Sequence, residues 1–196
     1  MRLIIILFIT GILPAACSSG SERSSNPHVV IDTQFGEIIC ELYPQKAPHS
    51  VAAFLHAVDS SFYDRSNFYR ILSEDNQVMG SWPATLIQGG LHATTNRRDY
   101  LPGIPHESTN ETGLTHRMGA LSFARSDTGT ATTEFFIVME DQKGFDFGGR
   151  NNPDGQGYAV FGQVVEGMDV VRSVYRRPES NQLFTPPVPI ISIKRE

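Results

Sequence analysis

Cysteines and metal-ligand patterns are scarce in this sequence. Two cysteines, Cys17 and Cys40, occur among 196 residues, so the sequence implies no disulfide framework. Cys40 stands in the apolar stretch GEIICELY, where we expect it to pack as a small hydrophobic residue. The six histidines lack metal-ligand spacing, and no second histidine follows His106-Glu107 four residues later. We therefore expect no metal site.

The patterns of covalent and nucleotide-dependent enzymes are also missing. No serine stands in a Gly-x-Ser-x-Gly elbow, and no cysteine has an evident histidine partner. The glycine-rich segment FGGRNNPDGQG at 147–157 lacks the Lys-Ser/Thr ending of a phosphate-binding loop and predicts a surface turn. There is no dinucleotide fingerprint either. We expect neither a hydrolytic reaction nor a bound cofactor.

Charge of either sign is not collected into a block. The chain has 16 Lys+Arg and 21 Asp+Glu, a mildly acidic balance that argues against electrostatic binding of nucleic acid. Hydrophobic residues make up 40% and charged residues 19%, which fits one globular domain with a sizeable core.

An apolar run, LIIILFITGIL, follows Arg2 at the N-terminus. The run is too short to span a bilayer comfortably and leads into small residues, which predicts a signal peptide over residues 1–16. The segment LPAAC, ending at Cys17, resembles a bacterial lipoprotein signal, in which cleavage before the cysteine leaves a lipidated N-terminus. Ordinary cleavage after Ala16 is the alternative.

A polar segment separates this signal from the rest of the chain. Residues 17–27 are small and polar, which predicts a flexible, lipid-attached tether ahead of a domain over 28–196. Signal and tether together predict an exported protein of the periplasm or cell envelope, anchored by lipid, at an outer membrane if the cell has one.

Within the domain, apolar patterns predict mostly short strands. The expected elements are a hairpin at 29–43, a helix at 47–61, strands at 67–72, 119–124, 134–139 and 158–165, a second helix at 167–175 and a closing strand at 188–196. Strands and helices do not alternate regularly, which indicates a mainly β protein, a closed antiparallel barrel capped by helices. Two loops stand out, at 73–84 and 147–157.

Six short motifs then point to one family. KAPHSVAAFLHAV, NFYRI, IQGG, GALSFARS, TEFFIV and YAVFGQVVEGMDVV occur in the order typical of a cyclophilin. From residue 28 onward the chain resembles a cyclophilin-type peptidyl-prolyl cis-trans isomerase, of a bacterial, exported kind. The resemblance implies a closed eight-stranded antiparallel β-barrel capped by two α-helices. It also implies binding of proline-containing polypeptides. We expect a monomer without cofactor, which the lipoprotein-like signal would attach to the membrane by its N-terminal lipid.

The resemblance assigns roles to single residues. Arg70, in NFYRI, matches the catalytic arginine, and Gln88, in IQGG, matches the glutamine that holds the substrate backbone. Phe136 matches the floor of the proline pocket, while Leu86 and Phe145 match its apolar walls. From the residues alone, Arg70 could instead lie outward with its stem on apolar neighbours, and Gln88 could precede a glycine turn.

Three further positions belong to the implied groove. Ala124 matches a wall, Arg125 matches a residue whose backbone pairs with substrate, and Tyr158 stands where many members have a histidine.

Other positions depart from the family pattern. Glu134 replaces a glutamine, Thr85 stands where a phenylalanine often lines the pocket, and Gly144 replaces a larger rim residue. Glu134 leaves two alternatives open: an ion pair that holds Arg70 in place, or one that pulls it off the substrate. The two loops are insertions relative to compact members and are expected near the ends of the groove.

Two functions follow from these observations. The first is acceleration of X-Pro bond rotation in exported proteins, with Arg70 donating a hydrogen bond to the prolyl nitrogen. The second is a membrane-tethered module that binds proline-containing segments, or assists assembly, with little isomerase activity.

Overall fold

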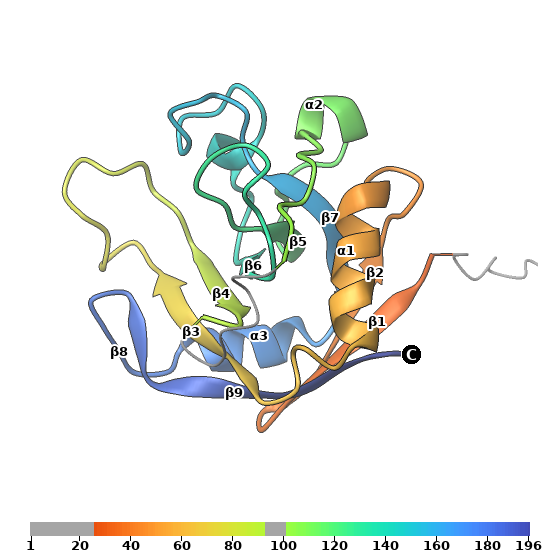
Figure 1. The fold of residues 1–196 in the computed structure, drawn as a ribbon. Coiled ribbons are helices and arrows are strands. Elements are labelled where there is room, and N and C mark those ends of the chain that lie inside the picture. Colours follow the sequence, from red (N-terminus) through yellow and green to blue (C-terminus); the bar gives the residue numbers. More distant parts are fainter. Residues whose placement is uncertain (1–25, 93–100) are drawn as a thin grey trace, which may run out of the picture.

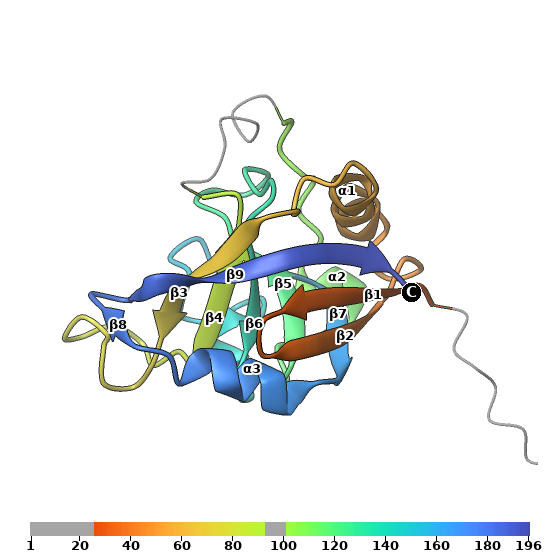
Figure 2. The ribbon, with the colours of Figure 1, turned by 90° about the horizontal axis from the view of Figure 1, so that it is seen from below.

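A closed antiparallel β-barrel forms the body of the protein (Figure 1 and Figure 2). The computed structural model describes residues 26–92 and 101–196. In these residues eight strands form the wall in the order β1, β2, β7, β5, β6, β4, β3 and β9, and β9 pairs with β1 to close it. The wall strands are β1 (His28–Thr33), β2 (Gly36–Leu42), β3 (Ser66–Leu72), β4 (Leu86–Gly90), β5 (Ala120–Phe123), β6 (Phe135–Val138), β7 (Ala159–Glu166) and β9 (Leu183–Arg195). The expected fold class is confirmed, with one additional short strand, β8 (Glu179–Ser180), paired to β9.

The two expected helices lie on opposite sides of this barrel (Figure 2). They are α1 (Pro48–Asp59) and α3 (Met168–Tyr175). A third helix, α2 (Thr109–Thr112), and a 3-10 turn, Lys143–Phe145, were not expected, because elements this short show no helical periodicity. Among the described residues, no helix has the length and apolar character needed to cross a membrane.

The predicted signal peptide over 1–16 and Cys17 lie outside the described residues, as does the predicted tether at 17–27 apart from its last two residues.

A distant glutamate caps the start of α1. Pro48 occupies the first turn, and Ala47, at the N-cap, has no side chain able to accept a hydrogen bond. Glu107 supplies the missing acceptors, because its carboxylate receives the backbone N–H groups of His49 at 3.0 Å and Ser50 at 2.8 Å. The helix is thereby tied to a segment almost sixty residues away.

Alternation along the wall strands divides the apolar residues into two clusters. In β6, Phe135 and Ile137 point into the barrel, where they join Phe54 of α1, while Phe136 and Val138 point out of it. The outer residues are also buried, because loops cover this part of the wall. The second cluster lies on the outside of the barrel and forms the base of the cavity described below.

Strand β4 was not among the strands expected from the sequence, and a glycine turn after Gln88 was left open as an alternative. Gly89 and Gly90 instead continue the strand and pair with Phe68 and Asn67 of β3. A Cβ at Gly89 would lie 2.8 Å from the Phe68 ring, and one at Gly90 would lie 2.6 Å from the Glu134 carboxylate. These glycines therefore serve close packing, which is the exception to their usual role as turn formers.

The last strand begins five residues earlier than expected. The turn between β8 and β9 contains Asn181 and Gln182, both with left-handed φ angles, 52° and 67°. A left-handed backbone is unfavourable for residues other than glycine, so contacts with the rest of the protein must stabilise this turn. The Gln182 carbonyl accepts the backbone N–H of Ile71 at 2.9 Å, so the turn is fastened to β3.

Candidate active site

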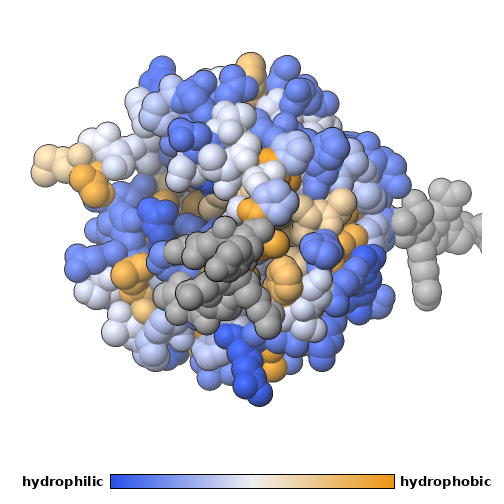
Figure 3. Space-filling view, viewed as in Figure 1, coloured by the Kyte–Doolittle hydropathy of each residue, from blue (hydrophilic) through white to orange (hydrophobic). Residues whose placement is uncertain are grey.

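A cavity of about 690 Å³ opens on the outer face of β3, β4 and β6, beside the segment that follows β5. Figure 3 shows the hollow, with hydrophobic residues inside it and hydrophilic residues around it. All nine residues that the sequence analysis assigned to catalysis or substrate binding line this cavity: Arg70, Leu86, Gln88, Ala124, Arg125, Glu134, Phe136, Phe145 and Tyr158.

Three aromatic rings form an apolar pocket at the base of the cavity. The Phe136 ring lies 5.5 Å from that of Phe145 and 5.4 Å from that of Tyr158, and the last two are 5.2 Å apart. All three pairs are arranged edge to face, which is a favourable geometry for aromatic rings. With Leu86 beside them, these rings offer a firm apolar surface to a small ring.

A buried histidine supports this pocket from behind. The His116 ring stacks on Phe136 at 5.9 Å, its Nδ1 lies 2.7 Å from Asp146, and its Nε2 lies 3.1 Å from the Ser122 hydroxyl. Burial lowers the pKa of His116, and the Asp146 carboxylate opposes this effect only in part. The Ser122 hydroxyl donates to the carbonyl of Ala159, so this serine, histidine and aspartate are fully engaged in the wall.

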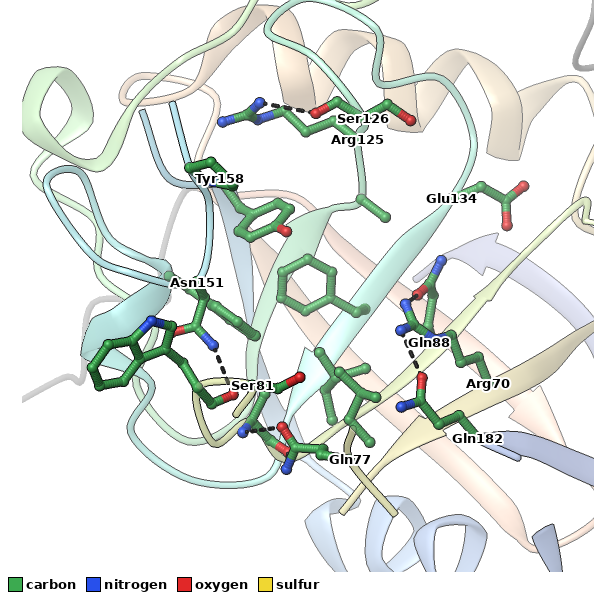
Figure 4. A pocket seen from close by; sticks show the side chains of 18 of the residues that line it. Arg70, Gln77, Ser81, Gln88, Arg125, Ser126, Glu134, Asn151, Tyr158 and Gln182 are labelled. Carbon is green, nitrogen blue, oxygen red and sulfur yellow. Dashed lines mark hydrogen bonds between the residues drawn. The ribbon is translucent and has the colours of Figure 1, made fainter. Parts of the chain in front are cut away.

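Arg70 stands at the edge of the aromatic pocket, held by two amides (Figure 4). Its Nη1 donates to Oε1 of Gln88 at 3.2 Å, and its Nη2 donates to Oε1 of Gln182 at 2.9 Å. Gln88 is itself fixed, because its Nε2 donates to the Tyr69 hydroxyl. Within the described residues Arg70 forms no ion pair, so no carboxylate in this part of the chain neutralises its charge.

Glu134 lines the same cavity but is occupied elsewhere. Its Oε1 accepts the backbone N–H of Leu91 at 2.9 Å and the Thr133 hydroxyl at 3.2 Å. Burial raises the pKa of this carboxyl, against which the hydrogen bonds from Tyr69, Thr133 and Leu91 act in the other direction. Glu134 and Arg70 form no ion pair in this structure, so neither of the two alternatives considered for Glu134 describes it.

The Arg125 side chain is turned toward the loop at 147–157. Its guanidinium binds the Asp154 carboxylate through two hydrogen bonds of 2.7 and 2.9 Å, and its Nε donates to the Gly157 carbonyl at 2.9 Å. These bonds lower the pKa of Asp154. The side chain is therefore engaged within the protein, and pairing of the Arg125 backbone with substrate stays a prediction.

The two insertions meet at the side of the cavity opposite Arg70. Nδ2 of Asn151 donates to the carbonyls of Trp82 at 3.3 Å and Pro83 at 3.5 Å, and the Arg150 guanidinium lies 4.7 Å from the centre of the Trp82 ring. Figure 4 shows Asn151 and Ser81 on this side, across the pocket from Arg70.

Comparison with known proteins assigns the chain to a family. Residues 28–195 match the sequence model of the cyclophilin type peptidyl-prolyl cis-trans isomerase/CLD family. The chain belongs to this family.

Curated relatives and solved structures agree with this assignment. Peptidyl-prolyl cis-trans isomerase A of Dickeya dadantii is 33% identical over 173 residues, covering 87% of this chain and 83% of the relative. Peptidyl-prolyl cis-trans isomerase B of Escherichia coli is 31% identical over 154 residues, covering 74% and 82%. The crystal structure of a Cryptosporidium parvum cyclophilin superposes with a TM-score of 0.67 at 20% identity, covering 87% of this chain and 98% of that one.

The departures of this cyclophilin from the family pattern have structural explanations. Thr85 faces away from the cavity, where its hydroxyl donates to Glu140 at 2.9 Å and accepts from Gln142 at 3.0 Å. A side chain at Gly144 would collide with Asn151, so the insertion occupies the rim position that a larger residue would take.

Four further side chains of this cyclophilin site could not be predicted from the sequence. Gln182 lies more than one hundred residues from Arg70 in the chain, and no motif marks its turn. His116 lacks any periodic or ligand-type spacing that would place it behind Phe136. Trp82 and Arg150 belong to the two insertions, whose conformations no family pattern predicts. In the part of the chain that the structure describes, no group of three or more His, Cys, Asp or Glu side chains is placed to hold a metal ion.

Proposed function

We propose that this cyclophilin catalyses cis-trans rotation about X-Pro bonds, with Arg70 donating a hydrogen bond to the prolyl nitrogen in the transition state. The arrangement of Arg70 carries this proposal. Its guanidinium stands beside an aromatic pocket, is oriented by the two neutral amides of Gln88 and Gln182, and meets no competing carboxylate among the described residues.

The chemistry of the reaction explains why an arginine suits it. A resonance barrier of ~18–20 kcal/mol opposes rotation about the peptide bond, and no covalent bond has to be broken. When the bond is twisted, the nitrogen lone pair is no longer delocalised and becomes a hydrogen-bond acceptor that the planar amide lacks. A donor to this nitrogen therefore stabilises the transition state more than the ground state, which raises the rate. A guanidinium remains charged at any working pH and holds its donors in a rigid plane.

The aromatic pocket supplies the grip on the proline. Phe136, Phe145 and Tyr158 would contact the pyrrolidine ring while the polypeptide before it turns. Exclusion of water from this surface strengthens the hydrogen bond from Arg70. A solved structure of the Cryptosporidium parvum cyclophilin was determined in the presence of the dipeptide Ala-Pro, which supports proline-containing segments as the ligand here.

The place of action is the second part of the proposal. The signal-like N-terminus ending at Cys17 favours export and attachment to a membrane by lipid, with the barrel acting as a monomer on exported chains in the cell envelope. Slow prolyl rotation can delay the folding of such chains. Mass spectrometry of the protein from its native membrane would detect a lipidated Cys17 as the new N-terminus; a mature chain beginning elsewhere, without lipid, would refute the anchor.

Exchange spectroscopy of a short X-Pro peptide tests the isomerase directly. Addition of the protein at a small fraction of the peptide concentration should broaden or exchange the cis and trans signals on a timescale far below the uncatalysed tens of seconds. If the peptide bound to the folded protein and exchange stayed slow, the binding module would be the better description.

A further inference from the structure

Trp82 and Arg150 form a stacked pair at one side of the proposed proline-binding cavity. The guanidinium lies 4.7 Å from the indole centroid, and both side chains line the same cavity as Phe136. Trp82 is 50% exposed, and Arg150 is also exposed. The pair is therefore accessible to a polypeptide that extends beyond the aromatic pocket.

Hydrogen bonds hold the two insertions that carry this pair. Asn151, next to Arg150, donates to the carbonyls of Trp82 and Pro83. The first insertion is closed on itself by Gln77, whose amide donates to the carbonyl of Ala84 at 3.0 Å and accepts its N–H at 2.9 Å. The relative position of indole and guanidinium is thus built into the fold.

Arg150 differs from the other two arginines of the cavity in having an unused hydrogen-bonding edge. Arg125 is paired with Asp154, and Arg70 is held by two amides. Among the described residues, Arg150 makes no hydrogen bond or ion pair, and its guanidinium lies over the Trp82 ring. A guanidinium held by a cation–π contact, with no hydrogen bond to a protein acceptor, keeps its N–H donors available to a ligand.

The charge of the cavity fits an anionic ligand. Three arginines line it against one carboxyl group, that of Glu134, and although Asp154 pairs with Arg125, Arg70 and Arg150 keep their charge while the whole chain carries a formal charge of −5. Burial also raises the pKa of Glu134, so this carboxyl opposes the positive potential less than an exposed one would.

We propose that Trp82 and Arg150 form a subsite for an acidic side chain, glutamate or aspartate, that flanks the proline in the bound polypeptide. A carboxylate accepts two parallel hydrogen bonds from a guanidinium edge, and the indole orders that guanidinium before the ligand arrives. The inference rests on the proposed function in so far as the proline occupies the aromatic pocket.

Paired peptides test the subsite by binding. Each peptide contains one proline. The two members of a pair differ at a single position, within three residues of the proline on either side, where one has glutamate and the other glutamine. Calorimetry or NMR titration measures the affinity of each peptide for the full-length protein. At one position, or at two neighbouring ones, the glutamate peptide should bind about threefold to tenfold more tightly than its glutamine partner. Added salt at about 0.5 M should reduce this preference, because the pair is exposed.

Variants connect the preference to the two side chains. In Arg150→Gln the affinity ratio between glutamate and glutamine peptides should fall to near one, and Trp82→Leu and Arg150→Lys should each lower it in part. Arg176→Gln removes an equal charge from an exposed position after α3 and should keep the parent ratio.

Three outcomes would overturn the proposal. Equal affinities within every peptide pair would exclude the subsite while leaving the isomerase in place, provided that the glutamine peptides are bound and isomerised. A glutamate preference that survives in Arg150→Gln would assign it to another cation. Failure to bind any of the peptides would contradict both this subsite and the proposed function.

Discussion

Arg70 illustrates how the site depends on single residues. One of its two anchors, Gln88, lies opposite it on the neighbouring strand and could be predicted from the family pattern. The other, Gln182, comes from a turn with a left-handed backbone and could not, because neither composition nor spacing reveals which distant turn folds over β3. Gln182 also donates to the Asn76 carbonyl at 3.2 Å, so it links the arginine to the first insertion.

Replacement of Gln182 should reduce turnover without unfolding the protein. Gln182→Ala removes the acceptor of Arg70 Nη2, and we expect kcat/KM for an X-Pro peptide to fall about threefold to tenfold, less than the full value of a hydrogen bond to a charged group because Gln88 still holds Nη1. Gln182→Glu should lower it further, because a carboxylate beside the guanidinium competes with the prolyl nitrogen. Parent-like kcat/KM in both variants, at unchanged thermal stability, would show that Arg70 needs no second anchor.

Replacement of Glu134 should have a small effect. Since Glu134 forms no ion pair with Arg70, Glu134→Gln should change kcat/KM by less than about threefold, and its amide oxygen can still accept from Leu91. Glu134→Ala, which removes the acceptor, serves as the comparison. A gain of more than about tenfold in the glutamine variant would reveal an inhibitory pair that this structure does not contain.

Because His116 is buried, we expect the free energy of unfolding to decrease in acid. Its pKa in the folded chain is lowered by burial, while in the unfolded chain it returns to its ordinary value of 6.5. As the pH falls below that value, the unfolded chain binds a proton before the folded chain does, so the free energy of unfolding decreases. Denaturant titrations from about pH 7 to about pH 5 should show a steeper loss in the parent than in His116→Gln. Equal slopes would mean that His116 takes up its proton in the folded state without penalty.

Strands and helices of this fold were predictable to different degrees. Patterns of alternation, short apolar runs and helical spacing predicted β1, β2, β3, β5, β6, β7, α1 and α3. Strand β1 buries alternate residues, whereas β6 is a short apolar run that is buried on both faces. Strand β4 was not predicted, because Gly89 and Gly90 usually indicate a turn. Here they are required because a larger side chain would collide with Phe68 or Glu134, and the sequence alone does not show these contacts. The short helix α2 depends on a local capping box between Ser108 and Glu111 and has no periodic face.

The cap on α1 can be tested at the level of this element. Glu107→Ala leaves the N–H groups of His49 and Ser50 without acceptors, so we expect the free energy of unfolding to fall by about 1–2 kcal/mol. Glu107→Gln retains one acceptor and should lose less. Chemical denaturation of the three proteins measures the difference. Unchanged stability in the alanine variant would show that water replaces the carboxylate at no cost.

In the whole molecule, the two faces of the barrel wall have different roles: the inner face forms the core and the outer face forms the cavity. Inward residues such as Phe135 build the core, while their neighbours such as Phe136 build the cavity on the outside. The family pattern therefore predicted the floor of the cavity and Arg70 together. It did not predict the rim near Trp82 and Arg150, because insertions are constrained by contacts with each other and by the space above Gly144.

The most direct test of this account is the separation of turnover from affinity in Arg70→Ala. If Arg70 acts only in the transition state, the catalysed exchange rate of an X-Pro peptide should fall by about two to three orders of magnitude, as the loss of ~3–4 kcal/mol implies, while its affinity changes by less than about threefold. Arg70→Lys, a charge without the rigid planar fork, should recover only part of the rate. Rate and affinity falling by the same factor, or a rate unchanged in a folded variant, would contradict the role assigned to Arg70.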